Sequence, residues 1–255
     1  MLRNVCVMTK KDFKTYFTTP IGYLVLSVFV GILGWMFCSA VFDFLKRTQA
    51  YAMYGQAPQM DINAMVMQPI IGNMAVIFLL MGALITMRLL AEEKKMKTIE
   101  LLLTSPLHPS EIILGKFFSA LMLYTLMLAF TLIYPLVLSV FGDSDWKQIL
   151  AGYLGIYLLG ASFIALGLFI SSLTENQITA GAVTFGLFLF FWIISWIAGP
   201  SDSLGGKILS QLSIIDHLSN FIRGLIDTRD VVYYLSLIFL GLFLTARSIE
   251  SQRWR

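Results

Sequence analysis

The chain has 255 residues, of which 58% are hydrophobic and 13% charged, and its mean hydropathy is +0.79. This composition is too apolar for an ordinary globular domain and indicates a membrane protein. The net charge of +3 comes with no basic run that carries interleaved aromatic residues, so nucleic acid is not an expected partner. Cys6 and Cys38 lie in a basic leader and in an apolar segment, and they do not indicate a disulfide framework.

The first predicted element is an amphipathic helix in residues 1–19. Its polar face carries Lys10, Lys11 and Lys14, and such a helix lies in the plane of the lipid headgroups. The segment lacks a small-residue cleavage site, so we expect it to be retained. Pro20 then suits the first turn of the next helix, where its missing N–H is not needed. The predicted apolar face consists of Leu2, Val5, Cys6, Phe13, Tyr16 and Phe17.

Six apolar segments follow the leader. A helix needs roughly 20 apolar residues to cross about 30 Å of hydrocarbon, and all six meet this requirement. None of them contains Asp, Glu, Lys or Arg. We therefore predict an all-α integral membrane fold, with residues 1–255 as a single domain. The predicted spans are 21–41, 69–87, 117–141, 149–173, 178–198 and 231–246.

The Lys and Arg residues are distributed unevenly between the two sides of these spans. Twelve of the 18 fall on the side that holds both termini and the linker between spans two and three, and six fall on the other side. Because positively charged loops stay in the cytoplasm, both termini are predicted to be cytoplasmic.

The segments between the spans differ in how strongly their sequences predict a structure. Residues 42–68 are polar and show no firm period, so they carry no structural prediction. Between spans four and five, Thr174 and Gln177 have capping-box spacing in a short cytoplasmic turn. In the last external segment, 199–230, Ser201 or Asp202 is suited to cap a first helix. The segment contains two short apolar faces, which are typical of helices that fold over the bundle. These faces are Leu204, Ile208, Leu212 and Ile215, followed by Leu218, Phe221, Ile222 and Leu225.

Several kinds of chemistry are not supported by the sequence. The spans carry no ionisable side chains that could relay protons, so the sequence does not support a proton-coupled carrier. A sodium-coupled carrier whose ion site is built from backbone carbonyls remains as the ion-coupled alternative. His108 and His217 are the only histidines and lie in predicted loops on opposite sides, so a metal site is not expected. There is no GxSxG nucleophile elbow and no P-loop. We expect a non-catalytic chain without a cofactor of its own, so any ATP is used by another polypeptide.

The linker between spans two and three is a dense block of charges of both signs. Glu93 stands four residues before Lys97, which favours a helix, and we predict that this helix continues to Leu103 and ends before Pro106. Ser110 and Glu111 then begin the next helix. Three consecutive leucines at 101–103 indicate an interface with a partner, whereas the alternative interpretation is a solvated hairpin.

Small residues at helical spacing occur in span four. Ala161 with Ala165, and Gly160 with Gly167, permit close approach of neighbouring helices. We interpret them as packing residues within the bundle, with a substrate path or a dimer seam as alternatives.

The order of elements and four local motifs resemble the permeases of type-2 ABC exporters, in the branch of the gliding-motility permease and the copper-associated permease. The motifs are Thr-Pro-Ile-Gly-Tyr at 19–23, Glu-Glu-Lys-Lys with Thr-Ile-Glu-Leu-Leu-Leu-Thr-Ser-Pro within 92–106, Ser-Leu-Thr-Glu-Asn-Gln at 172–177, and Phe-Ile-Arg-Gly-Leu-Ile-Asp-Thr-Arg-Asp-Val-Val-Tyr-Tyr at 221–234. At Lys97, relatives commonly have glycine.

This resemblance implies a subunit of the bacterial inner membrane that pairs with a second copy or a paralogue. It also implies two ABC ATPase subunits that hold ATP and Mg²⁺, with an accessory envelope protein as a further partner. Residues 1–19 would be the elbow helix, 91–112 the cytoplasmic coupling region and 199–230 the external helices.

The resemblance also assigns residues to two candidate sites. The residues implied to contact the ATPase are Glu92, Glu93, Lys94, Lys95, Thr98, Glu100, Leu101, Leu102, Thr104, Ser105 and Pro106. The candidates for an external gate are Phe221, Arg223, Gly224, Asp227, Arg229 and Asp230. The implied function is export of an unidentified substrate. The alternative is a membrane anchor of a larger ATPase-driven envelope machine, such as a gliding-motility complex, that moves no substrate itself.

Overall fold

The computed structural model describes residues 2–53, 61–99, 108–141, 144–197 and 211–253. Six helical segments within these ranges are long and apolar enough to span a membrane, which confirms the predicted all-α fold. The regular elements are α1 (Leu2–Thr18), α2 (Pro20–Met53), the π-helix η1 (Asn63–Met67), α3 (Gln68–Thr86), α4 (Ala91–Lys95), α6 (Pro109–Thr131), α7 (Ile133–Phe141), α8 (Trp146–Leu173), α9 (Gln177–Ile197), α11 (Ile214–Ile222) and α12 (Thr228–Arg253).

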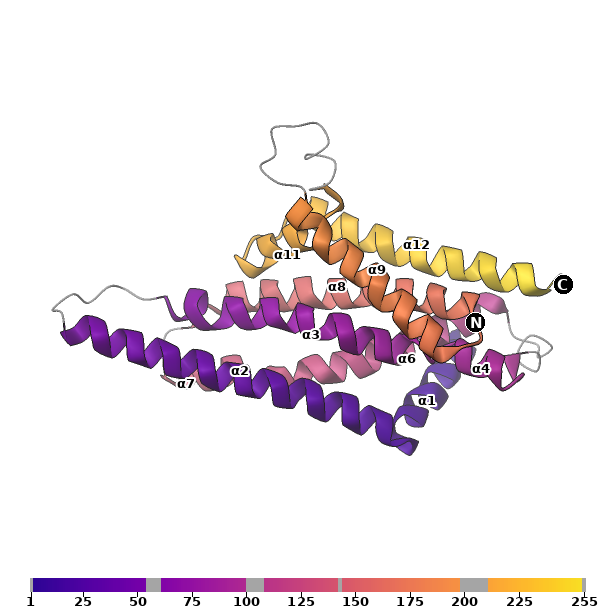
Figure 1. Ribbon diagram of the computed structural model, residues 1–255, viewed down its shortest axis with the longest axis horizontal. Helices are drawn as coiled ribbons and strands as arrows, with labels where there is room; N and C mark the ends of the chain where they lie inside the picture. The colour runs from indigo at the N-terminus through magenta and orange to yellow at the C-terminus, as the bar shows by residue number, and fades with distance from the viewer. Residues whose placement is uncertain (1, 54–60, 100–107, 142–143, 198–210, 254–255) are drawn as a thin grey trace.

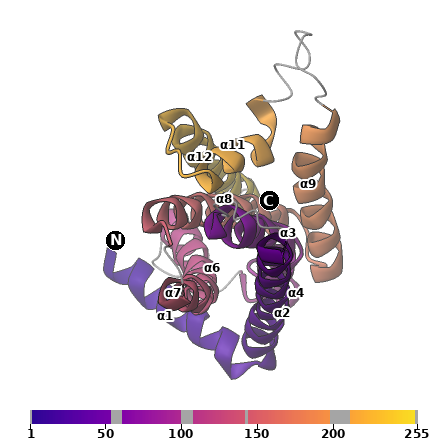
Figure 2. The same ribbon diagram turned by 90° about the vertical axis from the view of Figure 1, so that its left-hand side faces the viewer.

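Helix α8 lies in the middle of the bundle. It packs against α3, α6, α9, α11 and α12, as Figure 2 shows from one end of the molecule. In the most apolar window of α8, 72% of the residues are buried, whereas the corresponding fraction is 22% in α2, α9 and α12. The outer helices therefore present most of their apolar surface to lipid or to another subunit.

The small residues of α8 allow this close packing. A Cβ atom placed on Gly160 would lie 2.2 Å from the ring of Tyr124 in α6, and one on Gly167 would lie 2.3 Å from the hydroxyl oxygen of Thr86 in α3. The backbone of Ala165 is similarly close to Gly241 in α12. The sequence-based interpretation of these residues as packing residues within the bundle agrees with this arrangement.

The third span, predicted as one segment, is broken between α6 and α7. Pro135 has no N–H to donate to the carbonyl of Thr131, four residues earlier. The hydroxyl of Tyr153 in α8 donates to that carbonyl instead, at 3.0 Å. A neighbouring helix thus satisfies the backbone group that proline leaves without a partner.

Helix α1 runs across the long axis of the bundle, at the end where α4 and the C-terminal end of α12 also lie (Figures 1 and 2). The predicted leader helix is present, and the side chains that it buries against the bundle coincide only in part with its predicted apolar face. Val5 and Met8 are buried, whereas Leu2 is 87% exposed and Cys6 is exposed. Met8 is buried because α1 packs onto α6 at Gly115, where an added Cβ atom would meet Met8 at 2.7 Å.

One helix cap differs from the sequence-based prediction, and another was not predicted. Asn176, rather than Thr174, caps α9, because its side-chain oxygen accepts the N–H of Ile178 at 3.0 Å. Ser213 caps α11, and its hydroxyl accepts the N–H of Asp216 at 3.2 Å. The proposed caps Ser201 and Asp202, and the first predicted external helix up to residue 210, lie outside the described residues.

Two further features were not predicted. Helix α2 extends to Met53, twelve residues past the predicted end of the first span at 41. At about 1.5 Å per residue it is longer than the hydrocarbon thickness requires, so it tilts or projects beyond it. Helix α11 ends at Ile222, so Leu225 lies beyond the helix and does not continue its apolar face.

Candidate functional site

The helix predicted to run through the charged linker to Leu103 is wrong in its length, because α4 ends at Lys95. The chain leaves α4 through Lys97, whose φ of 55° lies in the left-handed region. The N–H of Lys97 donates to the carbonyl of Lys94 at 3.0 Å, and that of Thr98 to the carbonyl of Glu93 at 2.9 Å. This pair of bonds is a Schellman motif, which satisfies the last carbonyls of a helix and turns the chain away from its axis.

The start of α4 is held by the central helix. The hydroxyl oxygen of Ser171, near the end of α8, accepts the N–H groups of Leu90 and Ala91, both at 3.0 Å. The same hydroxyl lies 3.3 Å from the carbonyl of Met87, to which it donates. A buried serine therefore caps a helix that its own sequence leaves uncapped, and it fixes the bend between α3 and α4.

A second contact joins α4 to the C-terminal end of α8. The ammonium group of Lys94 donates to the carbonyl of Ser172. The hydroxyl of Ser248 in α12 donates to the same carbonyl at 3.4 Å. A cation is favourable there because the C-terminus of a helix carries a partial negative charge.

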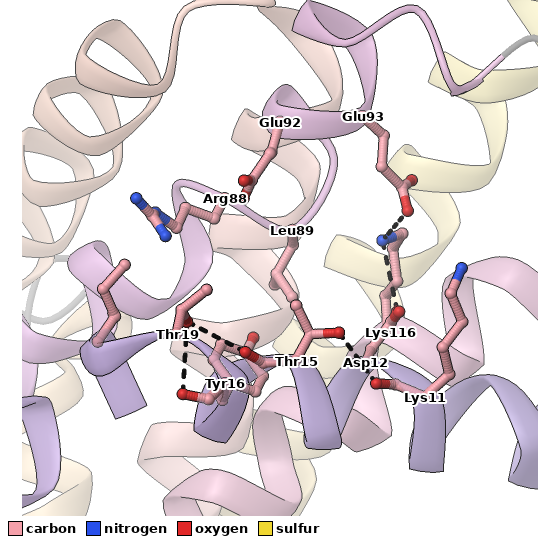
Figure 3. A pocket seen from close by; sticks show the side chains of 11 residues that line it. Lys11, Asp12, Thr15, Tyr16, Thr19, Arg88, Leu89, Glu92, Glu93 and Lys116 are labelled. Carbon is pink, nitrogen blue, oxygen red and sulfur yellow. Dashed lines mark hydrogen bonds and ion pairs between the residues drawn. The ribbon is translucent and has the colours of Figure 1, made fainter. Parts of the chain in front are cut away.

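Lys116 is the centre of a cluster of charges that connects three helices. It lies on α6 and is 4% exposed. Its ammonium group lies 2.7 Å from Oε1 of Glu93 on α4 and 3.4 Å from Oδ2 of Asp12 on α1 (Figure 3). We refer to Asp12, Lys116 and Glu93 as the charge cluster.

The charge cluster is not fully compensated. Burial raises the pKa of the Glu93 carboxyl, and the nearby ammonium of Lys116 only partly opposes this effect. The second carboxylate oxygen of Glu93 is buried and has no hydrogen-bond partner among the described residues. Burial similarly raises the pKa of the Tyr16 hydroxyl beside the cluster. The cluster is therefore weak support for stability and favours a role in positioning α4.

Helix α1 is tied to α6 by further polar contacts. The side-chain amide of Asn4 donates to the carboxylate of Glu111 at 3.3 Å, and the hydroxyl of Thr9 donates to the carbonyl of Gly115 at 3.3 Å. Glu111 also accepts the backbone N–H of His108 at 3.1 Å and so fixes the start of α6. The helix begins at Pro109, in agreement with the predicted start near Ser110 and Glu111.

A pocket of about 230 Å³ opens beside the charge cluster, between α1, the end of α3 and α4 (Figure 3). It brings side chains of both signs together from segments far apart in the sequence. Its lining consists of Lys11, Asp12, Thr15, Tyr16, Thr19, Ile21, Arg88, Leu89, Glu92, Glu93 and Lys116.

Five of the residues predicted to contact an ATPase lie within the described part of the linker, and their side chains point in different directions. Glu93 and Lys94 point back into the molecule, Thr98 donates its hydroxyl to the carbonyl of Glu93, and Lys95 is exposed. Glu92 lies in the wall of the pocket. Glu100, Leu101, Leu102, Thr104, Ser105 and Pro106 lie outside the described residues.

Three residues near the linker were missed by the sequence-based prediction. Asp12 and Lys116 complete the charge cluster, and Met96 presents a 68% exposed apolar side chain at the tip of α4. The available signals were that Asp12 is the single acid in a basic leader helix and that Lys116 stands at the very start of a span.

The predicted external-gate residues separate into a buried and an exposed group. Phe221 and Asp230 are buried, whereas Arg223, Asp227 and Arg229 are exposed. Gly224, two residues after the end of α11, adopts a φ of 85°. The buried members therefore act as internal contacts of this end of the molecule.

The carboxylate of Asp230 is held by α11. It lies 2.5 Å from Nδ1 of His217 and accepts the side-chain amide of Asn220 at 2.9 Å. His217, predicted to lie in a loop, is on α11 and stacks on the ring of Tyr233 at 4.1 Å. These contacts join α11 to the start of α12, and His217 and Asn220 are functional candidates that the sequence-based prediction missed.

In the described ranges, no group of three His, Cys, Asp or Glu side chains is placed to hold a metal ion. A comparison with curated proteins found no match. A family model described as "ABC-2 family transporter protein" matches residues 6–247, a range that includes the first five candidate spans and most of the sixth, in α12. The family implies an ABC ATPase as partner and a membrane as environment. The chain belongs to the ABC-2 transporter family and is a membrane-spanning permease subunit.

Proposed function

We propose that this permease pairs with a second copy or a paralogue in the bacterial inner membrane and exports its substrate on ATP hydrolysis by two separate ATPase subunits, which hold ATP and Mg²⁺. The family match supports the ATPase partnership. The excess of Lys and Arg supports a cytoplasmic location for both termini, and α4 lies at the same end of the bundle as those termini (Figure 1).

The observation that carries the proposed coupling is the charge cluster. A displacement of α4 by a bound ATPase acts on Lys116 through Glu93, and Lys116 also holds Asp12. Helix α4 is joined to the central helix through Ser171 as well. One movement of α4 is thus passed to α1, α6 and α8 together, in the manner of a rigid element that transmits a domain motion.

We infer two roles for the predicted ATPase-contact residues. Glu93 and Lys94 transmit the movement, because their side chains are used in contacts within the chain. The exposed Lys95 and Met96 belong to the contact surface, together with the sequence-predicted segment 100–106.

The test of the coupling role is Glu93→Gln, measured in the complex with the ATPase subunit reconstituted in lipid vesicles. The amide removes one negative charge from beside Lys116 and keeps the size of the side chain. We expect assembly to be retained and the permease-dependent stimulation of ATP hydrolysis to fall at least about 5-fold, the equivalent of roughly 1 kcal/mol of lost interaction. Wild-type stimulation in this variant would exclude the charge cluster as the route of coupling.

The matched control is Glu250→Gln, which removes a carboxylate from an exposed ion pair with Arg247 near the end of α12. We expect it to leave stimulation unchanged, because exposed ion pairs contribute little.

The contact surface has its own test. The double substitution Glu100→Lys with Leu102→Asp reverses one charge and introduces another in the predicted contact segment. We expect the stimulation of ATP hydrolysis and the co-purification of the ATPase to be lost. Membrane insertion, measured by membrane fractionation, should be normal. Stimulation at the wild-type level would remove segment 100–106 from the interface.

A further inference from the structure

A groove on the outside of the bundle, between α1 and α6, takes no part in the coupling described above. Its volume is about 480 Å³, and its lining is almost entirely apolar. We call it the α1–α6 groove. It is lined by Thr9 and Phe13 of α1, Tyr157 of α8, and Phe118, Leu121, Met122, Thr125, Leu126 and Ala129 of α6.

The length of the groove matches one leaflet of a bilayer. Along α6 it extends from Phe118 to Ala129, which corresponds to about 16 Å at about 1.5 Å per residue. Half of a hydrocarbon core of about 30 Å is about 15 Å. Phe118 and Met122 are 43% and 49% exposed, so the groove is open along its side.

Helix α1 closes one end of this groove. Thr9 and Phe13 stand at that end, and α1 runs across the axis of the bundle (Figure 2). A membrane-spanning helix lying in the groove would have to continue past α1, whereas an acyl chain ends where its headgroup begins. The closed end therefore favours a lipid over a helix of a second copy.

The exposed edge of α1 beside the groove is positively charged. Lys10 and Lys14 each follow a groove-lining residue of α1, and Arg3 lies on the same side of the helix at a spacing of seven residues from Lys10. All three are exposed, and the described residues offer them no ion-pair partner. The acid of α1, Asp12, is already engaged by Lys116.

We propose that the α1–α6 groove binds an anionic phospholipid. One acyl chain lies along α6 between Phe118 and Ala129, and the phosphate is held by Lys10 and Lys14, with Arg3 adding to the positive potential. The apolar lining supplies affinity for the chain, and the cations select the headgroup.

The test is native mass spectrometry of the full chain in detergent, titrated with phosphatidylglycerol or with phosphatidylcholine of the same acyl chains. We expect the wild type to retain phosphatidylglycerol more strongly. The double variant Lys10→Gln with Lys14→Gln should weaken this binding roughly 5-fold for each cation, hence about 25-fold together, and leave phosphatidylcholine unaffected. Ala129→Trp, which fills the groove from an exposed position, should weaken both lipids.

Two matched controls accompany these variants. Lys46→Gln with Arg47→Gln removes an exposed basic pair at the far end of α2, and Leu136→Trp adds an indole to an exposed position on α7. Both should bind phosphatidylglycerol as the wild type does. The proposal would be overturned if the wild type retained the two lipids equally. It would also be overturned if the Lys10→Gln with Lys14→Gln variant and the Ala129→Trp variant both retained phosphatidylglycerol as strongly as the wild type does. A loss of dimers without a loss of lipid in Ala129→Trp would overturn it in favour of a second copy.

Discussion

Lys97 and Gly224 both end a helix in the left-handed backbone conformation, although only one of them is glycine. Each follows a short helix, and each has a positive φ, of 55° and 85° respectively. After α11, the N–H of Gly224 donates to the carbonyl of Phe221 and that of Leu225 to the carbonyl of Asn220, both at 2.9 Å, which repeats the Schellman pattern at the end of α4. Glycine adopts this conformation without the steric cost that a Cβ atom brings, so Lys97 is the strained member of the pair.

Substitutions at these two positions are expected to change stability in opposite directions. Lys97→Gly should raise the free energy of unfolding by about 1 kcal/mol, because the left-handed conformation no longer carries a steric penalty. Gly224→Ala should lower it by about 1–2 kcal/mol, since the added Cβ would also approach Gln148 at 3.3 Å. Thermal unfolding in detergent measures both, and shifts of the same sign would contradict this account.

At the scale of elements, the helices that pack on α8 approach it where side chains are small. Gly241 of α12 is the closest case, because an added Cβ would lie 2.7 Å from the carbonyl carbon of Ala165 and 2.9 Å from the backbone nitrogen of Leu166. Those are backbone atoms of the most buried helix, so they cannot move aside as a flexible side chain does.

Alanine scanning of helical glycines should therefore distinguish tight from open positions. Gly241→Ala is expected to lower stability by about 1–3 kcal/mol through overpacking against α8. Gly186→Ala in α9, where a Cβ would meet nothing within 4 Å, is expected to be neutral or to raise stability by up to about 1 kcal/mol, because alanine favours a helix over glycine. Equal effects of the two variants on the unfolding temperature would show that this helix contact is not tight.

At the scale of the whole molecule, α8 connects two polar ends. At one end Ser171 and Ser172 bind α4, and at the other Gln148 donates its side-chain amide to the carbonyl of Ile222 at 3.3 Å. Near that second end, Gly155 lies directly against Phe221 of α11. A straight central helix that touches both α4 and α11 is suited to link a movement at one face of the membrane to the other, which is what the proposed coupling requires.

The orientation of the molecule can be tested by labelling single cysteines from outside the cell. In a variant with Cys6→Ser and Cys38→Ser, Leu225→Cys places a thiol on the exposed chain after α11, and Glu175→Cys places one on the exposed turn between α8 and α9. A membrane-impermeant maleimide should label Leu225→Cys in intact spheroplasts, whose outer membrane has been removed. It should label Glu175→Cys only after the inner membrane is permeabilised. The reverse pattern would contradict cytoplasmic termini.

The sequence by itself determined the number of spans, the leader helix and the uneven distribution of charge. These properties depend on composition and on periodicity within a single segment, which a folded structure does not alter. The resemblance of the motifs between residues 19 and 234 also led to the family that the match over 6–247 established. The partners of individual side chains could not be obtained in this way.

Only the tertiary structure decided what the charged linker does with its charges. Local spacing favoured a pair between Glu93 and Lys97 and a helix to Leu103, yet Glu93 binds Lys116, and Lys116 also reaches Asp12, 104 residues away in the sequence. That pairing exists because α1 crosses α6 beside the start of α4, and a crossing of helices is set by how whole surfaces pack together. An i,i+4 pair such as Glu93 with Lys97 stabilises a helix by only about 0.5 kcal/mol, which is too little to override the packing of whole helices.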